Sequence, residues 1–147
     1  MSATGGELIG RRFELLEEVG KGGFGVVYRA LDLKTKADVA LKVIRPDLFK
    51  KDVMSSRFAR EAAVLGQLMH PNIAHSVASS MEGDHAYIAM EWVDGRNLRQ
   101  ELLQRAQAGR EFTYDEVVEI AVQIANAVTY AHERNLVHRD LKPSNVM

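Results

Sequence analysis

A cluster of glycines near the N-terminus constrains the fold of this 147-residue chain more than any other feature. Gly20, Gly22 and Gly25 lie between two stretches with strand character, Arg12–Val19 and Phe24–Leu31. A dinucleotide-binding site would need a helix directly after its glycines, whereas the second stretch is rich in the β-branched and aromatic residues that favour strands. The pattern therefore predicts a hairpin whose glycine turn lets backbone N–H groups approach phosphate.

Three more strands are predicted in the first two thirds of the chain. The run Val39–Arg45 alternates in polarity, which places Ala40 and Lys42 on the same side of its strand. Two further strands are expected at about Ile73–Ser80 and His85–Val93, joined by a tight polar turn. With the hairpin, these segments predict a five-stranded sheet.

One helix is predicted between the third and fourth strands. From about Ser55 to Met69 the apolar residues have helical spacing, and Phe58, Leu65 and Leu68 share one face. The same face also contains the acidic residue Glu61.

After Val93 the sequence predicts helices only. A short helix is expected over about Asn97–Ala106. A longer helix begins at Thr113, because Thr113 and Glu116 have the spacing of a capping box, and its apolar face continues to Ala131. The chain therefore divides into a small sheet lobe and the start of a helical lobe.

Composition excludes several classes of protein and of site. The chain has 19 Lys and Arg against 20 Asp and Glu, a near-neutral balance that gives no reason to expect a nucleic acid as partner. It has no cysteine, which excludes disulfides and Cys-ligated zinc and fits a cytoplasmic location. The most apolar window, Val117–Ala131, is interrupted by polar residues, so no membrane segment is expected.

Lys42 and Glu61 are predicted to form an ion pair. A lone lysine on an apolar strand usually extends to solvent, but Ala40 on the same side leaves room there for a flat ligand. An inward-facing carboxylate such as that of Glu61 needs a partner, because burying it unpaired costs several kcal/mol. Lys42 is the natural partner.

The segment Val137–Met147, VHRDLKPSNVM, carries the densest chemistry of the chain. A polar turn after a helix would be the plain interpretation. Asp140, Lys142 and Asn145, however, are the groups that phosphoryl transfer needs: an acceptor for the proton of the attacking hydroxyl, a cation, and an amide oxygen for Mg²⁺.

Taken together, these segments resemble the signature set of the protein kinases. Four motifs follow one another in the family's order, namely G-x-G-x-x-G-x-V from Gly20, V-A-L-K ending at Lys42, Glu61, and H-R-D-L-x-x-x-N from His138. The form DLKPSN resembles the serine/threonine branch of the family. The resemblance implies an α+β, protein-kinase-like fold: a five-stranded antiparallel N-lobe sheet with one helix, followed by the first helices of a mainly helical C-lobe.

The resemblance also implies domain limits. Residues 1–11 would form an N-terminal arm, residues 12–93 the ATP-binding N-lobe, and residues 94–147 the hinge, the start of the C-lobe and the catalytic loop.

The resemblance implies ATP and Mg²⁺ as cofactors and assigns residues to them. Lys42, held by Glu61, would pair with the α- and β-phosphates, Met90 would be the gatekeeper, and Glu91 and Val93 would offer backbone groups to the adenine edge. Val27 and Ala40 would cover the ring and Met147 would lie beneath it. The implied cofactor-binding set is Gly20, Lys21, Gly22, Gly23, Phe24, Gly25, Val27, Ala40, Lys42, Glu61, Met90, Glu91, Val93 and Met147.

For catalysis, the resemblance implies that Asp140 is the catalytic base, that Lys142 contacts the γ-phosphate, and that Asn145 binds Mg²⁺. Lys42 completes the catalytic set. Arg139 beside Asp140 marks the class controlled by activation-loop phosphorylation. His138 and Leu65 would belong to an internal hydrophobic spine, and Ser76 departs from the aliphatic residue expected near its position, although Val77 is adjacent.

The family's next motifs, D-F-G and A-P-E, do not occur before Met147. The sequence therefore predicts a serine/threonine protein kinase of which this chain is the ATP-binding half, inactive by itself. We expect the long helix from Thr113 to expose an apolar face.

Two other functions stay open at this stage. The first is a nucleotide-binding or scaffolding module of the pseudokinase kind, and the second is a small-molecule kinase, whose loops generally lack the DLKPSN form. For the kinase, protein substrates with Ser or Thr are the expected partners, with no nucleic acid, and a kinase dimer is left open.

Overall fold

The computed structural model describes residues 6–22, 25–45, 66–81 and 86–147. The chain forms two compact units, which are described separately. The sheet unit comprises Met1–Met69 and Ala74–Trp92, and the helical unit comprises His70–Ile73 and Val93–Met147.

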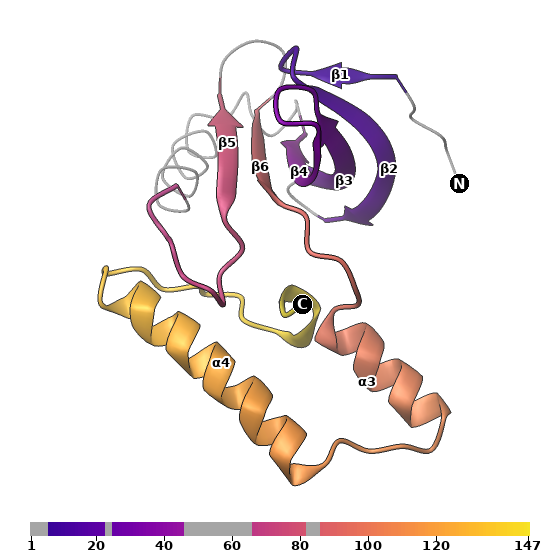
Figure 1. Ribbon diagram of the computed structural model, residues 1–147, viewed down its shortest axis with the longest axis vertical. Helices are drawn as coiled ribbons and strands as arrows, with labels where there is room; N and C mark the ends of the chain where they lie inside the picture. Colours follow the sequence, from indigo (N-terminus) through magenta and orange to yellow (C-terminus); the bar gives the residue numbers. More distant parts are fainter. Residues whose placement is uncertain (1–5, 23–24, 46–65, 82–85) are drawn as a thin grey trace. The chain divides into compact units, whose positions relative to one another are not determined.

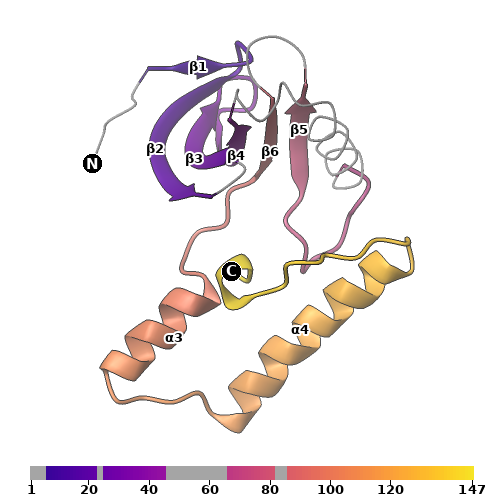
Figure 2. The ribbon, with the colours of Figure 1, turned by 180° about the vertical axis from the view of Figure 1, so that it is seen from behind.

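The sheet unit is built on one antiparallel sheet with the strand order β1-β2-β3-β4-β6-β5. Its long strands β2 and β3 curl strongly, as Figure 1 shows, and Figure 2 shows the same sheet from behind. The strands are β1 (Leu8–Ile9), β2 (Phe13–Lys21), β3 (Gly25–Asp32), β4 (Ala37–Ile44), β5 (Ser76–Ser80) and β6 (Tyr87–Glu91). All pairs of neighbouring strands are antiparallel.

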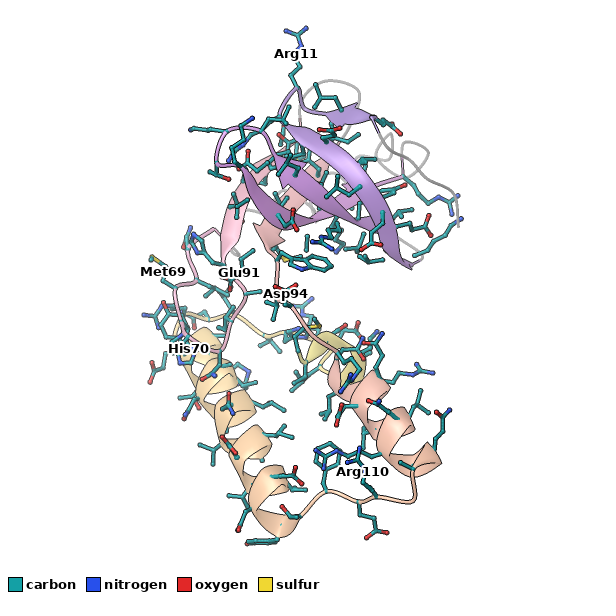
Figure 3. All side chains as sticks on the ribbon, turned by 45° about the vertical axis from the view of Figure 1, so that its right-hand side comes forward. Arg11, Met69, His70, Glu91, Asp94 and Arg110 are labelled. Carbon is teal, nitrogen blue, oxygen red and sulfur yellow. The ribbon has the colours of Figure 1, made fainter. Side chains whose placement is uncertain are left out.

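The five predicted strands are present, but the expected strand count is corrected by a sixth, β1. This strand lies in the segment predicted to be an arm, and Leu8 and Ile9 pair with Glu14 and Phe13. Gly10 and Arg11 both have positive φ, 58° and 55°, which lets the chain reverse between the two strands. Two residues are too few to show a strand pattern in the sequence. The Arg11 side chain extends away from the sheet (Figure 3).

One face of the sheet carries the main hydrophobic core of this unit. Its buried members come from five of the strands and are Ile9, Phe13, Leu15, Ala30, Val39, Leu41, Tyr87 and Ala89. The rings of Phe13 and Tyr87 meet edge to face, with centroids 5.4 Å apart. The turn at Gly10 touches the same core, because a Cβ on Gly10 would lie 2.7 Å from the Tyr87 ring.

A buried ion pair fixes the turn between β3 and β4. Asp32 is fully buried, and its two carboxylate oxygens accept from Arg12 Nε at 2.9 Å and Nη2 at 2.7 Å. The Lys34 N–H and the Thr35 hydroxyl donate to the same carboxylate. These donors, Arg12 first, hold the pKa of Asp32 well below its usual range.

The helical unit contains α3 (Leu98–Gln107), α4 (Tyr114–His132) and the 3-10 turn η1 (Pro143–Asn145). Both α-helices begin with a capping box, Asn97 with Gln100 for α3 and Thr113 with Glu116 for α4. The predicted box at Thr113 is therefore confirmed. The chain leaves α4 through Asn135, whose φ of 60° is typical of the residue after a helix end.

Helix α4 is apolar on more than one side. The predicted stripe is Val117, Ile120, Ile124, Val128 and Ala131. Its last four members are half-buried, whereas its first, Val117, is exposed, as are Tyr114, Val118 and Val122. The expected exposure of apolar surface on this helix is therefore confirmed, although the exposed residues lie mainly beside the predicted stripe.

The turn His70–Ile73 belongs to the helical unit, although the residues on both sides of it belong to the sheet unit. The amide of Asn72 donates to Gln123 Oε1 at 3.1 Å, and the His70 ring lies 5.0 Å from the Tyr130 ring.

The helix predicted over Ser55–Met69 falls largely outside the described residues. Its last part, Gly66–Met69, is described and is not helical, so the predicted end of that helix is wrong. No helix in the described ranges is long and apolar enough to cross a membrane.

Candidate functional site

The glycine turn connects β2 to β3 as a hairpin, and the Gly22 N–H donates to the Gly25 carbonyl at 2.9 Å. A strand follows the turn, which excludes the dinucleotide-type helix. The three glycines differ in what surrounds them: a Cβ on Gly25 would lie 2.2 Å from the Val43 carbonyl oxygen, whereas nothing lies within 4 Å of one on Gly20. Of these three positions, only Gly25 lies so close to a neighbouring backbone that no side chain would fit.

Strand register brings the residues assigned to ATP onto one face of the sheet. Directly paired residues of antiparallel strands point to the same side. Val27 is paired with Lys42, and two positions further along β4, Ala40 is paired with Met90. Val27, Ala40, Lys42 and Met90 are all half-buried on this face, opposite the main core.

The two residues expected at the adenine edge are Glu91, the last residue of β6, and Val93, two residues further along the chain. Glu91 is tied to the start of β5: its N–H donates to the His75 carbonyl at 2.8 Å, and its carboxylate accepts from the His75 N–H at 3.0 Å. Figure 3 labels Glu91 at this point. Val93 is the first residue of the helical unit after the strand. Ser76 lies opposite Met90, while Val77 packs against the main core.

The predicted catalytic residues of the helical unit lie together on one loop. Lys142 Nζ and Asp140 Oδ2 are 2.7 Å apart, and Asn145 Nδ2 donates to the Asp140 carbonyl at 2.8 Å. The side chains of Asp140 and Lys142 are at least half exposed. The Lys142 ammonium, first among several groups, lowers the pKa of Asp140, which keeps this carboxylate ionised.

The backbone before Asp140 is tightly bent. The Asp140 N–H turns back to the His138 carbonyl at 2.8 Å and lies 3.3 Å from His138 Nδ1. Arg139 between them has a φ of 61°, a conformation that costs energy for a residue with a side chain. The bend aims the carboxylate of Asp140 toward Lys142 and Asn145.

Oxygen ligands for a hard cation are present on this loop. Since Asn145 donates through its nitrogen, its Oδ1 is the group left for a metal, and Asp140 supplies a carboxylate. Mg²⁺ takes few protein ligands and completes its shell with water and phosphate, so this donor set fits it. Within the described ranges no group of three or more His, Asp or Glu residues gathers at a point that could hold a metal.

Met147 lies beside a cavity of about 340 Å³ in the helical unit, lined also by Leu98, Phe112, Ile120 and Val146. The loop that carries the catalytic residues is anchored here, because the Leu98 N–H donates to the Val146 carbonyl at 2.8 Å. The Met147 side chain itself is exposed.

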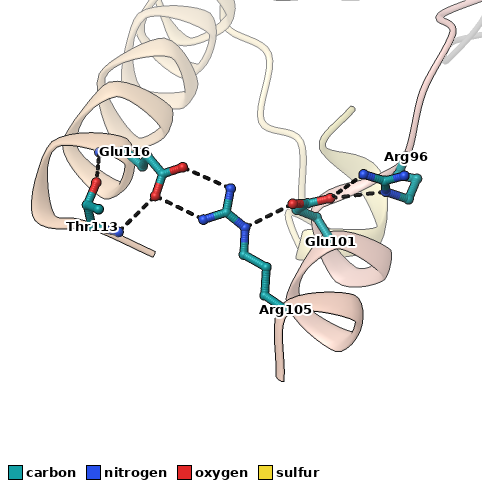
Figure 4. A network of polar contacts seen from close by, with 5 residues as sticks. All are labelled: Arg96, Glu101, Arg105, Thr113 and Glu116. Atoms are coloured by element: carbon teal, nitrogen blue, oxygen red, sulfur yellow. Dashed lines mark hydrogen bonds and ion pairs between the residues drawn. The ribbon is translucent and has the colours of Figure 1, made fainter. Parts of the chain in front are cut away.

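One polar network joins α3 to α4 and was not predicted from the sequence (Figure 4). The Arg105 guanidinium donates to both carboxylate oxygens of Glu116 at 2.8 and 2.9 Å and to Glu101 at 2.9 Å. Arg96 also donates to Glu101 at 3.0 Å. The Arg105 hydrogen bonds, with the Thr113 cap, lower the pKa of Glu116 to about 2. The capping-box spacing was the only signal that pointed toward Glu116.

Several predicted site residues fall outside the described ranges. These are Gly23 and Phe24 of the glycine turn, Glu61, and the spine residue Leu65. The Lys42–Glu61 ion pair therefore stays a prediction.

Sequence comparison finds relatives along nearly the whole chain. The family described as "Protein kinase domain" matches residues 13–147. Serine/threonine-protein kinase PrkC of Bacillus subtilis is 35% identical over 142 residues, which cover 97% of this chain and 21% of PrkC. Serine/threonine-protein kinase Nek11 of Homo sapiens is 36% identical over 143 residues, which cover 95% of this chain and 22% of Nek11. The chain thus spans about a fifth of the length of these relatives.

Comparison with solved structures agrees with the sequence match. The kinase domain of Mycobacterium tuberculosis PknI superposes with a TM-score of 0.79 at 31% identity, covering 99% of this chain and 57% of the PknI chain. The predicted family and fold class are confirmed by these matches together with the strand order and the two helices described above. This chain belongs to the protein kinase family, and its named relatives are serine/threonine kinases.

Proposed function

We propose that this chain is the ATP-binding part of a serine/threonine protein kinase, which transfers the γ-phosphate of ATP to Ser or Thr hydroxyls of proteins. The observation that carries the proposal is the loop on which Asp140, Lys142 and Asn145 meet, in a chain of the kinase family. An ionised carboxylate, a cation and an amide are the groups that such a transfer uses.

In the sheet unit, residues of one face bind ATP. Backbone N–H groups of the glycine turn, from Gly20 to Gly25, bind the phosphates, and Lys42 neutralises their charge with Glu61 as its partner. Val27 and Ala40 pack on the adenine. Met90 limits the space next to it. The register that places Val27, Ala40, Lys42 and Met90 on one face supports these roles.

At the other end of the nucleotide, Glu91 and Val93 offer backbone groups to the base, and Met147 packs against it. Glu91 is already held by His75 through two hydrogen bonds, one from its backbone N–H and one to its carboxylate, which supports a rigid edge at this position.

In the helical unit, Asp140 orients the substrate hydroxyl and accepts its proton. The Lys142 ammonium lowers the pKa of Asp140, so the carboxylate is ionised and can accept the hydrogen bond of the substrate hydroxyl. Lys142 compensates the charge of the moving phosphoryl group, and Asn145 holds Mg²⁺ through its amide oxygen. The ion, when bound, neutralises phosphate charge and fixes the phosphate geometry.

The proposal is tested by measuring the transfer of radiolabel from [γ-³²P]ATP to a pool of peptides that contain Ser and Thr. The enzyme in this assay is the full protein that the gene encodes. We expect Asp140→Asn to lower the rate by about 10²–10⁴-fold, the usual share of a positioned base. Lys42→Met should also abolish most transfer. Arg110→Met, on the exposed loop between α3 and α4, is the matched control and should leave the rate unchanged.

Transfer that persists in Asp140→Asn, or label found only on tyrosine, would contradict the proposal. ATP binding without any transfer in the unaltered protein would instead favour the nucleotide-binding module of the pseudokinase kind.

A further inference from the structure

Arg29 lies on the same face of the sheet as the residues assigned to ATP. On β3 it is two positions beyond Val27, and the register pairs it directly with Ala40, which is itself paired with Met90. The row that begins at Arg29 therefore continues through Ala40, proposed to pack on the adenine, and Met90, proposed to limit the space beside the base. The neighbouring row holds Val27, also proposed to pack on the adenine, and Lys42, proposed to neutralise the phosphates.

The Arg29 guanidinium is held by carboxylates of both neighbouring strands. Its Nε donates to Asp38 Oδ2 at 2.8 Å, and Nη2 binds the same oxygen. Nη1 lies 3.8 Å from a carboxylate oxygen of Glu17 on β2. Two carboxylates around one arginine neutralise its charge, so this group is not positioned to bind an anion.

The same guanidinium also lies over the indole of Trp92, with its central carbon 5.2 Å from the ring centroid, the distance of a cation–π contact. Trp92 is the last residue of the sheet unit and separates Glu91 from Val93. Holding its ring against β3 restrains the backbone on both sides of it. Those two neighbours are the residues proposed to offer backbone groups to the base.

We propose that Arg29 is a positioning residue for the adenine end of bound ATP, acting through Trp92. The inference rests on the proposed function, because it presumes that adenine lies beside Ala40. Arg29 itself touches no substrate: it fixes the ring of Trp92, and with it the peptide groups that hydrogen-bond the base. Its effect is therefore confined to the base and independent of the phosphates.

Intrinsic fluorescence tests the contact itself, because Trp92 is the sole tryptophan of the 147-residue chain. In Arg29→Met, acrylamide should quench Trp92 more strongly than in the unaltered chain. Arg29→Lys, which keeps the cation and loses the planar fork, should lie between the two. Arg110→Met should not change quenching.

Affinities for adenosine, ADP and ATP, each with Mg²⁺ and measured by competition with a fluorescent nucleotide, test the role. We expect Arg29→Met to raise all three dissociation constants by the same factor, about threefold, which is the usual size of a part-exposed cation–π contact. Arg29→Lys should recover part of the loss. Lys42→Met, in contrast, should weaken ADP and ATP but not adenosine.

Three results would overturn the inference: unchanged adenosine affinity in Arg29→Met despite stronger quenching, a loss confined to ADP and ATP, or no binding of any of the three ligands by the unaltered chain. The kinase proposal is judged separately by the Asp140→Asn transfer assay. If circular dichroism shows that Arg29→Met does not fold, Asp38→Asn removes the anchoring charge instead. Like Arg29→Met, Asp38→Asn should increase the quenching of Trp92 and raise the dissociation constant for adenosine.

Discussion

Among the described residues, every buried side chain lies in the sheet unit, whereas the helical unit has none. Strands β1 to β4 and β6 contribute to a core that includes Phe13, Leu41 and Ala89, each with no exposed area. Helices α3 and α4 are instead joined by the charged network around Arg105. The two units also carry different parts of the proposed reaction, ATP binding on the sheet and hydroxyl activation on the loop after α4.

Because the two units are held together by different forces, the stability of each should respond to different changes. Apolar burial is non-directional and little affected by salt, so the sheet should respond mainly to changes of side-chain volume. Ion pairs at the surface contribute little each and are screened by salt. The helical unit should therefore respond to pH and ionic strength more than to the loss of a methyl group.

The largest expected effect comes from the core of the sheet. Leu41→Ala should lower the free energy of unfolding by about 3 kcal/mol, because the side chain is fully buried and leaves a cavity. Urea titration followed by Trp92 fluorescence measures it. Ile124→Ala on α4, at a half-buried position, is the matched control and should cost less than about 1 kcal/mol. Equal costs at both positions would remove the contrast between the units.

The ion pair of Arg12 and Asp32 should have the next largest effect. Arg12→Met leaves a fully buried carboxylate without its main partner, which should cost about 2 kcal/mol at pH 7, less than for a wholly buried pair because Arg12 is partly exposed. Urea titration at pH 7 and pH 3 measures both the cost and its pH dependence.

The sign of that pH dependence follows from the pKa of Asp32, which is lower in the folded chain than in the unfolded one. The stabilisation is fully present above the unfolded pKa of about 4 and is lost as the pH falls below it toward the folded pKa. Asp32→Asn should remove this part of the acid sensitivity. An unchanged pH profile in that variant would mean that the pair does not stabilise the sheet.

The smallest expected effect is that of Arg105 in the helical unit. Arg105→Met should lower the helical circular dichroism signal and the midpoint of its thermal loss. The shift in midpoint should be less than about a third of the shift that Leu41→Ala causes in the same experiment, because surface ion pairs are weak. About 0.5 M NaCl should reduce the midpoint of the unaltered chain and hardly that of the variant. Arg99→Met, exposed on the same helix, is the matched control.

Acid should act on this network in the same direction. Glu116 has its pKa lowered to about 2, so its contribution is present above about pH 4.5 and is lost between there and pH 2. A midpoint that rises on acidification, or that ignores salt in the unaltered chain, would show that packing and not charge holds α3 to α4.

Much of the fold could be predicted because its signals are local. The strand at Val39–Arg45 was recognised from its alternation and is observed at Ala37–Ile44, and the start of α4 was recognised from the box of Thr113 and Glu116. Strand β1 was not predicted, because a strand of two residues is too short to show an alternation of polar and apolar side chains. The end of the helix predicted to Met69 was placed too late, because an apolar stripe does not show where a helix unwinds.

The candidate site was predictable to a similar degree. Asp140, Lys142 and Asn145 are close in sequence, so a single turn of the chain is enough to bring them together. The pairing of Glu91 with His75, and the cluster of Arg29 with Trp92, had no signal in the sequence. Each joins residues whose contact depends on which strands become neighbours.

The sequence by itself determined the elements and the chemical groups: glycines for a hairpin, alternation for strands, caps for helices, and a carboxylate, an ammonium and an amide within six residues. Only the tertiary structure decided which of several arginines meets which carboxylate and which strands share a face. The physical reason is the distance along the chain over which each kind of interaction acts. Backbone preferences and caps act between near neighbours in the chain, whereas strand register and ion-pair partners are fixed by the packing of the whole sheet or helix pair.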